Sequence, residues 1–275
     1  MKLVLGLYLR QVQSERLMIS PIVGLSPLEI ELLLDQSLEK VKDFHEENPS
    51  WRDENPPENR GNYYGRGDFL DSCRSVRNKI ARERYLETPQ IIVERGEERY
   101  STSYNQQIEE RIKEKLAQFK RTGEEGTPPA DKIFSKRFAK EREWIFEQQL
   151  AIVRYLCATQ DRYVKSRNPL DLEPITQEDV AENIGYSATS VCRLVKNLSV
   201  RLPDQKVIFA EELIPGVKAT LLKGRYALRQ LQQDSGLYEN QKWKISDREL
   251  VPILKERFGI DVARRTVSKY KGKLG

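Results

Sequence analysis

The sequence is poor in the residues that most often carry catalysis, metal binding and cross-linking. Its 275 residues include one histidine and three cysteines. Cys73, Cys157 and Cys192 are widely spaced and form no CxxC motif, which fits a reducing compartment better than a disulfide framework. The lone imidazole of His45 cannot supply a histidine-rich metal site. We therefore predict a protein that is not an enzyme, with no catalytic residue, no metal and no cofactor.

Long apolar runs are also missing. No run approaches the ~20 residues that a membrane-spanning helix needs. The apolar opening, residues 1–9, has neither the long apolar core nor the small-residue cleavage site of a signal peptide. We expect a cytoplasmic protein with no membrane partner.

Charge is plentiful and unevenly distributed. Charged residues make up 32% of the chain, with a formal net charge of +5. Residues 1–60 carry seven Lys or Arg against eleven Asp or Glu, whereas residues 216–275 carry fourteen against six. A basic C-terminal segment is typical of a phosphate binder. The acidic N-terminal segment would be repelled by DNA, so we expect it to meet protein.

Apolar spacing predicts a mainly α fold of helical bundles, with two helix-turn-helix modules and a small β-hairpin. Ser26, Pro27 and Glu29 form the start of the first helix, because serine can cap it, proline suits its first position and glutamate completes a capping box. The expected elements are a helix from Pro27 to about Phe44, a short helix at about 72–85, a hairpin of 91–93 and 100–104, a helix over 108–119 and a long helix over about 133–164.

Residues 175–197 have the pattern of a helix-turn-helix. Val180 and Ala181 form the inner face of the first helix, Gly185 can take the positive φ of the turn, and Ser187 can cap the second helix. The second helix of such a motif enters the DNA major groove. We expect its outward positions to contact DNA; they include Thr189, Ser190, Arg193 and Lys196.

A second DNA-reading candidate lies near the C-terminus, in the octet that runs from Ala263 to Tyr270. On a helix, Val267 and Tyr270 face a core, with Ala263 one turn before Val267. Much of the opposite face is taken by the cationic side chains of Arg264, Arg265 and Lys269. These side chains repel one another unless an anion lies against them. Guanidinium groups fit both phosphates and the edge of guanine. The predicted contacts are Arg264, Arg265, Ser268, Lys269 and Lys271.

This octet resembles the C-terminal box of the bacterial sigma-54 family, Ala-Arg-Arg-Thr-Val-Ala-Lys-Tyr-Arg, from which it differs at Ser268 and Lys271. The resemblance implies that the box reads the GG element of a promoter. The helix-turn-helix is similar to that of the family at Asp179, Val180, Ala181, Gly185, Val191 and Arg193. The family arginine that supports recognition of the GC element falls on Arg193. The family's His-Glu-Ser-Thr segment is replaced by residues 187–190.

The resemblance implies a domain plan and a set of partners. Residues 1–51 resemble the family's activator-response region, 52–88 form a polar linker, 89–215 hold the hairpin and the helix-turn-helix, and 216–275 form a C-terminal DNA-binding domain whose box spans 263–271. The partners implied are promoter DNA, core RNA polymerase and an ATPase activator, in the nucleoid of a bacterial cytoplasm. The family's large core-binding domain has no counterpart in 52–88, which is too short and too polar.

Three hypotheses follow. The first is a sigma-54-like factor that recognises promoter DNA in transcription initiation. The second is a stand-alone helix-turn-helix regulator that binds such promoters without recruiting polymerase. The third, a recombinase or transposase, needs a metal-binding acidic cluster or an activated Ser or Tyr. The acidic residues instead recur at the spacings of solvated helix faces.

Overall fold

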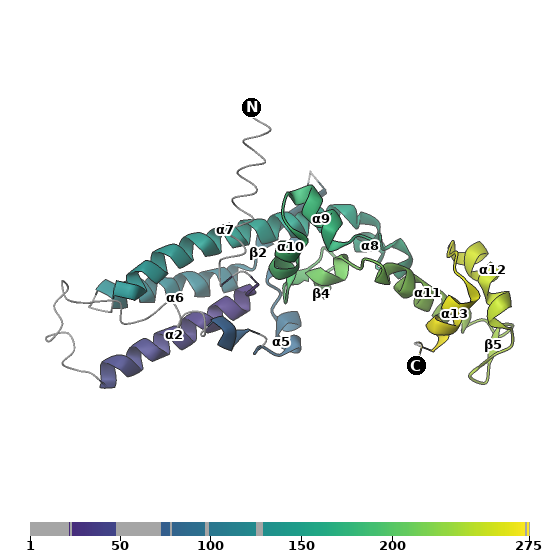
Figure 1. Cartoon of the computed structure of the whole chain (residues 1–275), viewed down its shortest axis with the longest axis horizontal. Coiled ribbons are helices and arrows are strands. Elements are labelled where there is room, and N and C mark those ends of the chain that lie inside the picture. Colours follow the sequence, from purple (N-terminus) through teal and green to yellow (C-terminus); the bar gives the residue numbers. More distant parts are fainter. Residues whose placement is uncertain are drawn as a thin grey trace, which may run out of the picture. The chain divides into compact units, whose positions relative to one another are not determined.

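The computed structural model describes residues 22, 24–47, 73–77, 79–96, 99–124, 129–272 and 274 (Figure 1). The described chain is mainly helical with a small sheet, as the apolar periodicity predicted. It divides into two compact units, of which the first holds residues 1–155 and 177–211 and the second holds 156–176 and 212–275. This division differs from the boundary that we expected at 215/216, because a segment before the helix-turn-helix joins the C-terminal unit.

The first unit contains helices and a sheet. The helices are α2 (Pro27–Glu47), α5 (Arg82–Glu87), α6 (Gln106–Glu124), most of α7 (Pro129–Thr159), α9 (Gln177–Ile184) and α10 (Ala188–Val195). The predicted capping box of α2 is confirmed, since the Ser26 amide donates to Glu29 Oε2 at 2.8 Å and the Glu29 amide donates to Ser26 Oγ at 3.3 Å.

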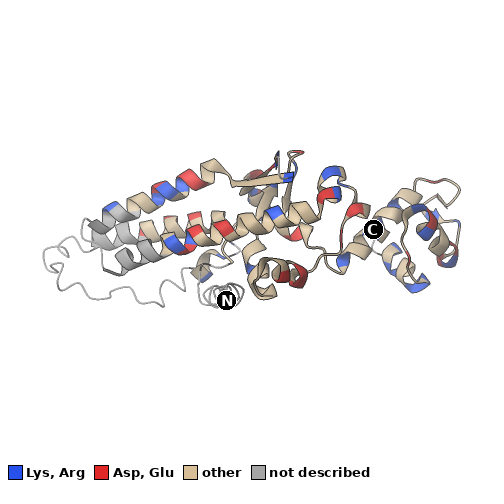
Figure 2. Cartoon of the chain, turned by 90° about the horizontal axis from the view of Figure 1, so that it is seen from above, with Lys and Arg blue, Asp and Glu red and all other residues tan. Residues whose placement is uncertain are grey.

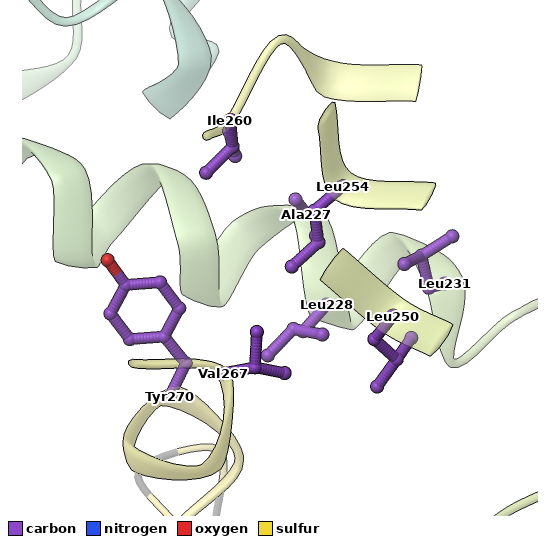
Figure 3. Packing of buried hydrophobic residues seen from close by; sticks show 8 residues of the cluster. All are labelled: Ala227, Leu228, Leu231, Leu250, Leu254, Ile260, Val267 and Tyr270. Atoms are coloured by element: carbon purple, nitrogen blue, oxygen red, sulfur yellow. The ribbon is translucent and has the colours of Figure 1, made fainter. Parts of the chain in front are cut away.

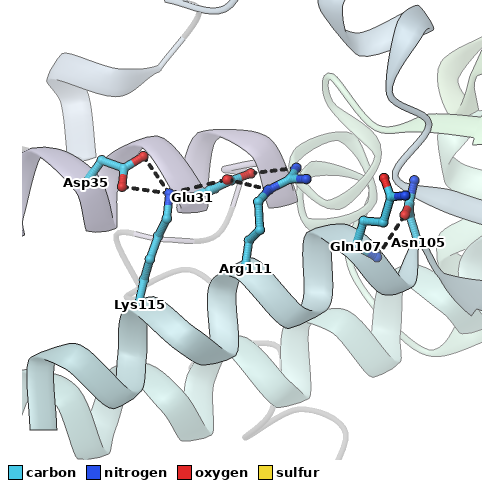
Figure 4. Close-up of polar contacts among 6 residues, drawn as sticks. All are labelled: Glu31, Asp35, Asn105, Gln107, Arg111 and Lys115. Atoms are coloured by element: carbon cyan, nitrogen blue, oxygen red, sulfur yellow. Dashed lines mark hydrogen bonds and ion pairs between the residues drawn. The ribbon is translucent and has the colours of Figure 1, made fainter.

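Ion pairs join α2 to α6 (Figure 4). Arg111 Nε lies 2.7 Å from Glu31 Oε1, and Lys115 Nζ lies 2.6 Å from Asp35. Burial opposes ionisation of Glu31, but the Arg111 hydrogen bond and the Lys115 charge hold the pKa of Glu31 below its usual value. The acidic N-terminal helix therefore meets cations of its own chain.

The predicted hairpin belongs to a larger sheet. Strands β1 (Ile91–Gly96) and β2 (Arg99–Tyr104) pair antiparallel, and β1 also pairs in parallel with β3 (Ser199–Arg201), which pairs with β4 (Val207–Phe209). The strand order is β2-β1-β3-β4. The sheet thus attaches the chain that follows the helix-turn-helix to the hairpin that precedes it. We did not predict β3 and β4.

Two predicted helices are interrupted. The short helix expected at 72–85 is helical at 73–76 and again in α5, and Cys73 and Tyr85 are each 2% exposed. The end of the segment expected to be a polar linker is therefore packed. The long helix expected over 133–164 ends at Thr159, and α8 (Asp161–Ser166) follows. Gln160 separates them, and its buried side chain donates to the carbonyls of Glu173 and Leu213.

The second unit packs around α11 (Lys218–Leu231). Its other elements are α8, the 3-10 helix η1 (Pro169–Asp171), the hairpin β5 (Tyr238–Glu239) and β6 (Lys242–Trp243), α12 (Asp247–Phe258) and α13 (Arg264–Lys271). The residues of η2 (Ala210–Leu213) are divided between the two units. Figure 3 shows the core, in which Val267 and Tyr270 of α13 meet Leu228 of α11 and Leu254 of α12. This core fixes which face of α13 is turned outward.

Candidate nucleic-acid interface

The helix-turn-helix predicted at 175–197 is confirmed as α9 and α10. Gly185 takes φ 75° at the turn, a conformation that costs glycine little. Ser187 caps α10, since its side chain accepts a hydrogen bond from the Ser190 amide at 3.1 Å. Val191 and Leu194 are fully buried. The pattern of small, apolar and capping residues is what sets this local structure.

Three of the four α10 side chains that we predicted to contact DNA lie on its outer face. Thr189 and Arg193 are exposed, and Lys196 is half-buried at the C-cap. The expectation that Ser190 points outward is wrong. Ser190 is 2% exposed, because its hydroxyl lies 2.8 Å from that of the capping Ser187 and turns toward the start of the helix.

A buried glutamine ties α10 to α7 and the sheet. Tyr104 Oη donates to Gln149 Oε1 at 2.6 Å, and Gln149 Nε2 donates to the Leu194 carbonyl at 3.0 Å. Gln149 is 1% exposed. At the turn, Tyr186 Oη donates to Gln148 Oε1 at 2.6 Å. Helix α10 is therefore held near both of its ends against the long helix α7.

The segment before α2 also touches α10. A Cβ added to Gly24, which has φ +90°, would lie 3.4 Å from Cβ of Arg193. Asn197 Nδ2 donates to Glu29 Oε1 at 3.3 Å. The Cβ atom of Arg193 thus lies close to the backbone of Gly24, while Arg193 as a whole is exposed.

In the C-terminal unit, α13 shows the predicted two faces. Val267 is fully buried and Tyr270 is 3% exposed, whereas Arg264, Arg265 and Lys269 are exposed. Among the residues that the structure describes, no carboxylate forms an ion pair with these three cations. Lys and Arg recur along the helices of this unit (Figure 2). One expectation for the octet is wrong: Ala263 is exposed, because it is the N-cap residue and precedes the helical face.

A glycine in α11 allows α13 to pack closely against that helix. A Cβ added to Gly224 would lie 2.1 Å from Cε2 of Tyr270, far closer than two carbon atoms can approach. The Tyr270 ring therefore occupies the space that a side chain at position 224 would fill. This contact lies on the side of α13 opposite its exposed cations.

Two of the predicted contacts in the box are bound to a carboxylate of the same chain. Lys271 Nζ lies 2.6 Å from Asp247 Oδ1, and the Ser268 hydroxyl donates to the other oxygen of Asp247. Lys271 Nζ also lies 5.0 Å from the centre of the Trp243 ring. Hydrogen bonds from Lys271 and Ser268 hold the pKa of Asp247 below its usual value. We predicted Ser268 and Lys271 from the sequence as free to meet DNA; in the structure both are bound to a carboxylate.

Sequence reasoning missed Asp247 and Gln149. Asp247 follows the capping residue Ser246, which forms a capping box with Glu249, and its sequence position is that of an ordinary first-turn acid. The hairpin β5–β6 that presents Trp243 was also missed, although Asn240 and Gln241 take the positive φ typical of a tight hairpin turn. No local signal marks Gln149, because its partners lie 45 residues away on either side.

Within the described parts of the chain, no group of three or more His, Cys, Asp or Glu side chains is placed to hold a metal ion. In the same residues, no helix is long and apolar enough to cross a bilayer.

Comparisons with known proteins agree with this geometry. The family model described as "Sigma-54, DNA binding domain" matches residues 136–275. An RNA polymerase sigma-54 factor of Pseudomonas putida KT2440 is 26% identical over 199 residues, covering 68% of this chain and 39% of the relative. One from Acinetobacter guillouiae is 32% identical over 109 residues, covering 38% and 22%.

The chain thus spans about two fifths of the length of several curated relatives that it matches. A solved structure, Aquifex aeolicus sigmaN bound to promoter DNA, aligns with a TM-score of 0.41 at 17% identity, over 76% of this chain and 68% of the other.

Proposed function

This chain belongs to the sigma-54 family, because the family's DNA-binding domain covers just over half of it, and on that premise we propose that it recognises promoter DNA in transcription initiation. It would do so as a DNA-binding protein without catalysis, in the nucleoid of a bacterial cytoplasm. Helix α13 would read the GG element of the promoter, and α10 would read the GC element.

The observation that carries the proposal is the outward face of α13. Arg264, Arg265 and Lys269 are exposed together on a helix whose other face is anchored by Val267 and Tyr270. Cations on one helix face that form no ion pair within the described residues repel one another, and a phosphate backbone relieves that repulsion. Arginine also donates two hydrogen bonds to O6 and N7 of guanine in the major groove. The geometry suits a GG dinucleotide.

Helix α10 supplies a second reading face. Arg193 and Thr189 are exposed, and the buried links through Gln149 and Gln148 hold the helix in one orientation. A rigid support favours direct readout, because a reading side chain then loses little conformational freedom on binding. Arg193 is the residue that we assign to the GC element.

The short polar segment 52–88, which stands between the parts that resemble the family, favours a second candidate function. In this alternative, the protein is a stand-alone regulator that occupies such promoters without recruiting RNA polymerase. A pull-down with core polymerase separates the two: retention of polymerase supports a working sigma factor, and a clean absence of binding supports the regulator. An ATPase activator is a partner in the first case alone.

The proposal predicts a selective loss for Arg265→Ala. If Arg265 reads guanine, the substitution should weaken binding to a duplex with GG and GC elements by about 1–3 kcal/mol, or roughly 5- to 150-fold, and should relax the preference for GG. Fluorescence anisotropy on the promoter duplex and on a scrambled duplex measures both effects.

Arg257→Ala is the matched control, since it removes a guanidinium of the same unit that instead pairs with Asp234 at 3.1 Å. It should change the two affinities equally and little. Equal binding of the parent protein to promoter and scrambled duplexes would refute the proposed function. Unchanged binding by Arg265→Ala would refute the role of that residue alone.

A further inference from the structure

Asp247 occupies an unusual place beside the reading helix. It is the first residue of α12, and its two carboxylate oxygens bind two successive turns of α13, through Lys271 Nζ at 2.6 Å and through the Ser268 hydroxyl. The side chains of Lys271 and Asp247 are 20% and 25% exposed. Among the ion pairs in the described part of the C-terminal unit, the two side chains of this pair are the least exposed to solvent.

Trp243 closes the arrangement from the hairpin. Its ring lies 5.0 Å from Lys271 Nζ, and Tyr238 packs edge-on against it with ring centres 5.1 Å apart. An ammonium held over an indole face and beside a carboxylate is stabilised by both contacts. Lys271 therefore already has favourable partners in its own chain, Asp247 and Trp243, when no DNA is bound.

The cations of α13 thus fall into two classes. Arg264, Arg265 and Lys269 are exposed and lack an ion pair within the described residues, whereas Lys271 is neutralised. Nonspecific affinity for DNA depends on the number of phosphates that free cations neutralise, because each one releases bound counterions. A cation already paired with a carboxylate adds little to that number.

We propose that Asp247 is a specificity-determining residue of the DNA interface, which holds α13 through Ser268 and Lys271 and withdraws the charge of Lys271 from the phosphate backbone. This inference rests on the proposed function. Withdrawing the charge of Lys271 lowers the phosphate contribution to the binding of every sequence. Holding α13 through Ser268 and Lys271 keeps the base-reading arginines oriented, which favours the promoter alone, so that the ratio of promoter to nonspecific binding rises.

The central experiment compares Asp247→Asn with the parent protein by anisotropy at several salt concentrations. Asparagine keeps the shape of the side chain but frees the charge of Lys271. We expect stronger binding to a scrambled duplex, a smaller preference for the promoter duplex, and a salt slope steeper by about 0.9 on logarithmic axes. Glu239→Gln is the control, because it removes an exposed carboxylate of the same unit that pairs with Lys244; it should leave the slope unchanged.

Lys271→Ala supplies the second arm of the experiment. In the Asp247→Asn background it should reverse the added slope, because the double variant has the same net charge as the parent protein. A double variant whose slope stays as steep as that of Asp247→Asn would show that the freed charge of Lys271 does not reach a phosphate, and would overturn the proposal. Circular dichroism melts establish that each variant is folded.

The slope can be measured on scrambled DNA alone, so a failure of promoter recognition would not conceal the result. If Asp247→Asn weakens promoter and scrambled binding equally at an unchanged slope, Asp247 has only a structural role and the proposal is wrong. Ser268→Ala then reports the positioning contact separately, because it leaves the ion pair intact. We expect it to lower promoter affinity without changing the salt slope.

Discussion

Cys192 lies on the reading helix α10, directly before Arg193, and is exposed. The other two thiols, Cys73 and Cys157, are buried, and burial raises the pKa of each to about 12. Because the thiolate is the reactive form, the buried thiols react slowly at neutral pH. The chain therefore carries one accessible thiol at the place where we expect DNA.

A maleimide at neutral pH should label Cys192 first, and a promoter duplex should slow that labelling because DNA covers the helix face. Mass spectrometry of the labelled peptides over time measures the rates. Cys192→Ser identifies the signal, and a scrambled duplex at the same concentration measures nonspecific cover. Labelling that stays equally fast with saturating promoter DNA would place α10 away from the groove.

At the scale of single residues, the sequence predicted exposure better than pairing. Spacing alone placed Val267 and Tyr270 inward and Arg264 and Arg265 outward, because a helix has one period. It could not show that Lys271 is bound to Asp247, 24 residues earlier in the chain. It also placed Ser190 outward, since the hydroxyl pair with Ser187 depends on the cap geometry.

At the scale of elements, the contact between α11 and α13 depends on Gly224. The Tyr270 ring fills the position of the missing side chain. On helix propensity alone, Gly224→Ala should stabilise α11 by about 1 kcal/mol. The steric conflict has the opposite sign, and overpacking of this kind costs about 1–3 kcal/mol.

We expect Gly224→Ala to lower the melting temperature and to weaken binding to the GG element, because α13 must shift away from α11. Thermal melts followed by anisotropy measure the two effects. Thr220→Ala is the control, as an exposed position of the same helix. The penalty should shrink when Tyr270→Ala is combined with Gly224→Ala; an undiminished penalty would mean that another contact is responsible.

Helices were predictable from the sequence where the residues that cap them lie close to their first turn. The capping boxes at Ser26 and Ser246 and the serine cap of α10 all lie within four residues of the helix that they begin. The strand β3 was not predictable in this way. It has three residues, and its parallel pairing with β1 joins Ile91 to Val200, which lie far apart in the sequence.

At the scale of the whole molecule, each unit carries one of the two helices that we propose to read DNA, α10 in the first and α13 in the second. Once one helix has bound, the second binds from the same chain at a raised effective concentration. A duplex with both elements should therefore bind more tightly than a duplex with either one.

Arg193→Ala should remove most of that advantage while leaving binding to a GG-only duplex unchanged. Anisotropy titrations on GG-only, GC-only and combined duplexes test this expectation, with Arg257→Ala as the control variant. If the combined duplex binds no better than the GG-only duplex, only one helix engages DNA at a time, and our assignment of two readers is wrong.

The second unit is not a continuous stretch of chain. The polypeptide enters it at residue 156, leaves it at 177 to build the helix-turn-helix, and returns at 212. Leu170, from the first stretch, packs against the core formed around α11 and α13. A single genetic crossover at any codon of the chain would divide at least one folded unit between two parents, and one between codons 156 and 211 would divide both. Helices α10 and α13 are therefore inherited as a pair wherever both units stay intact.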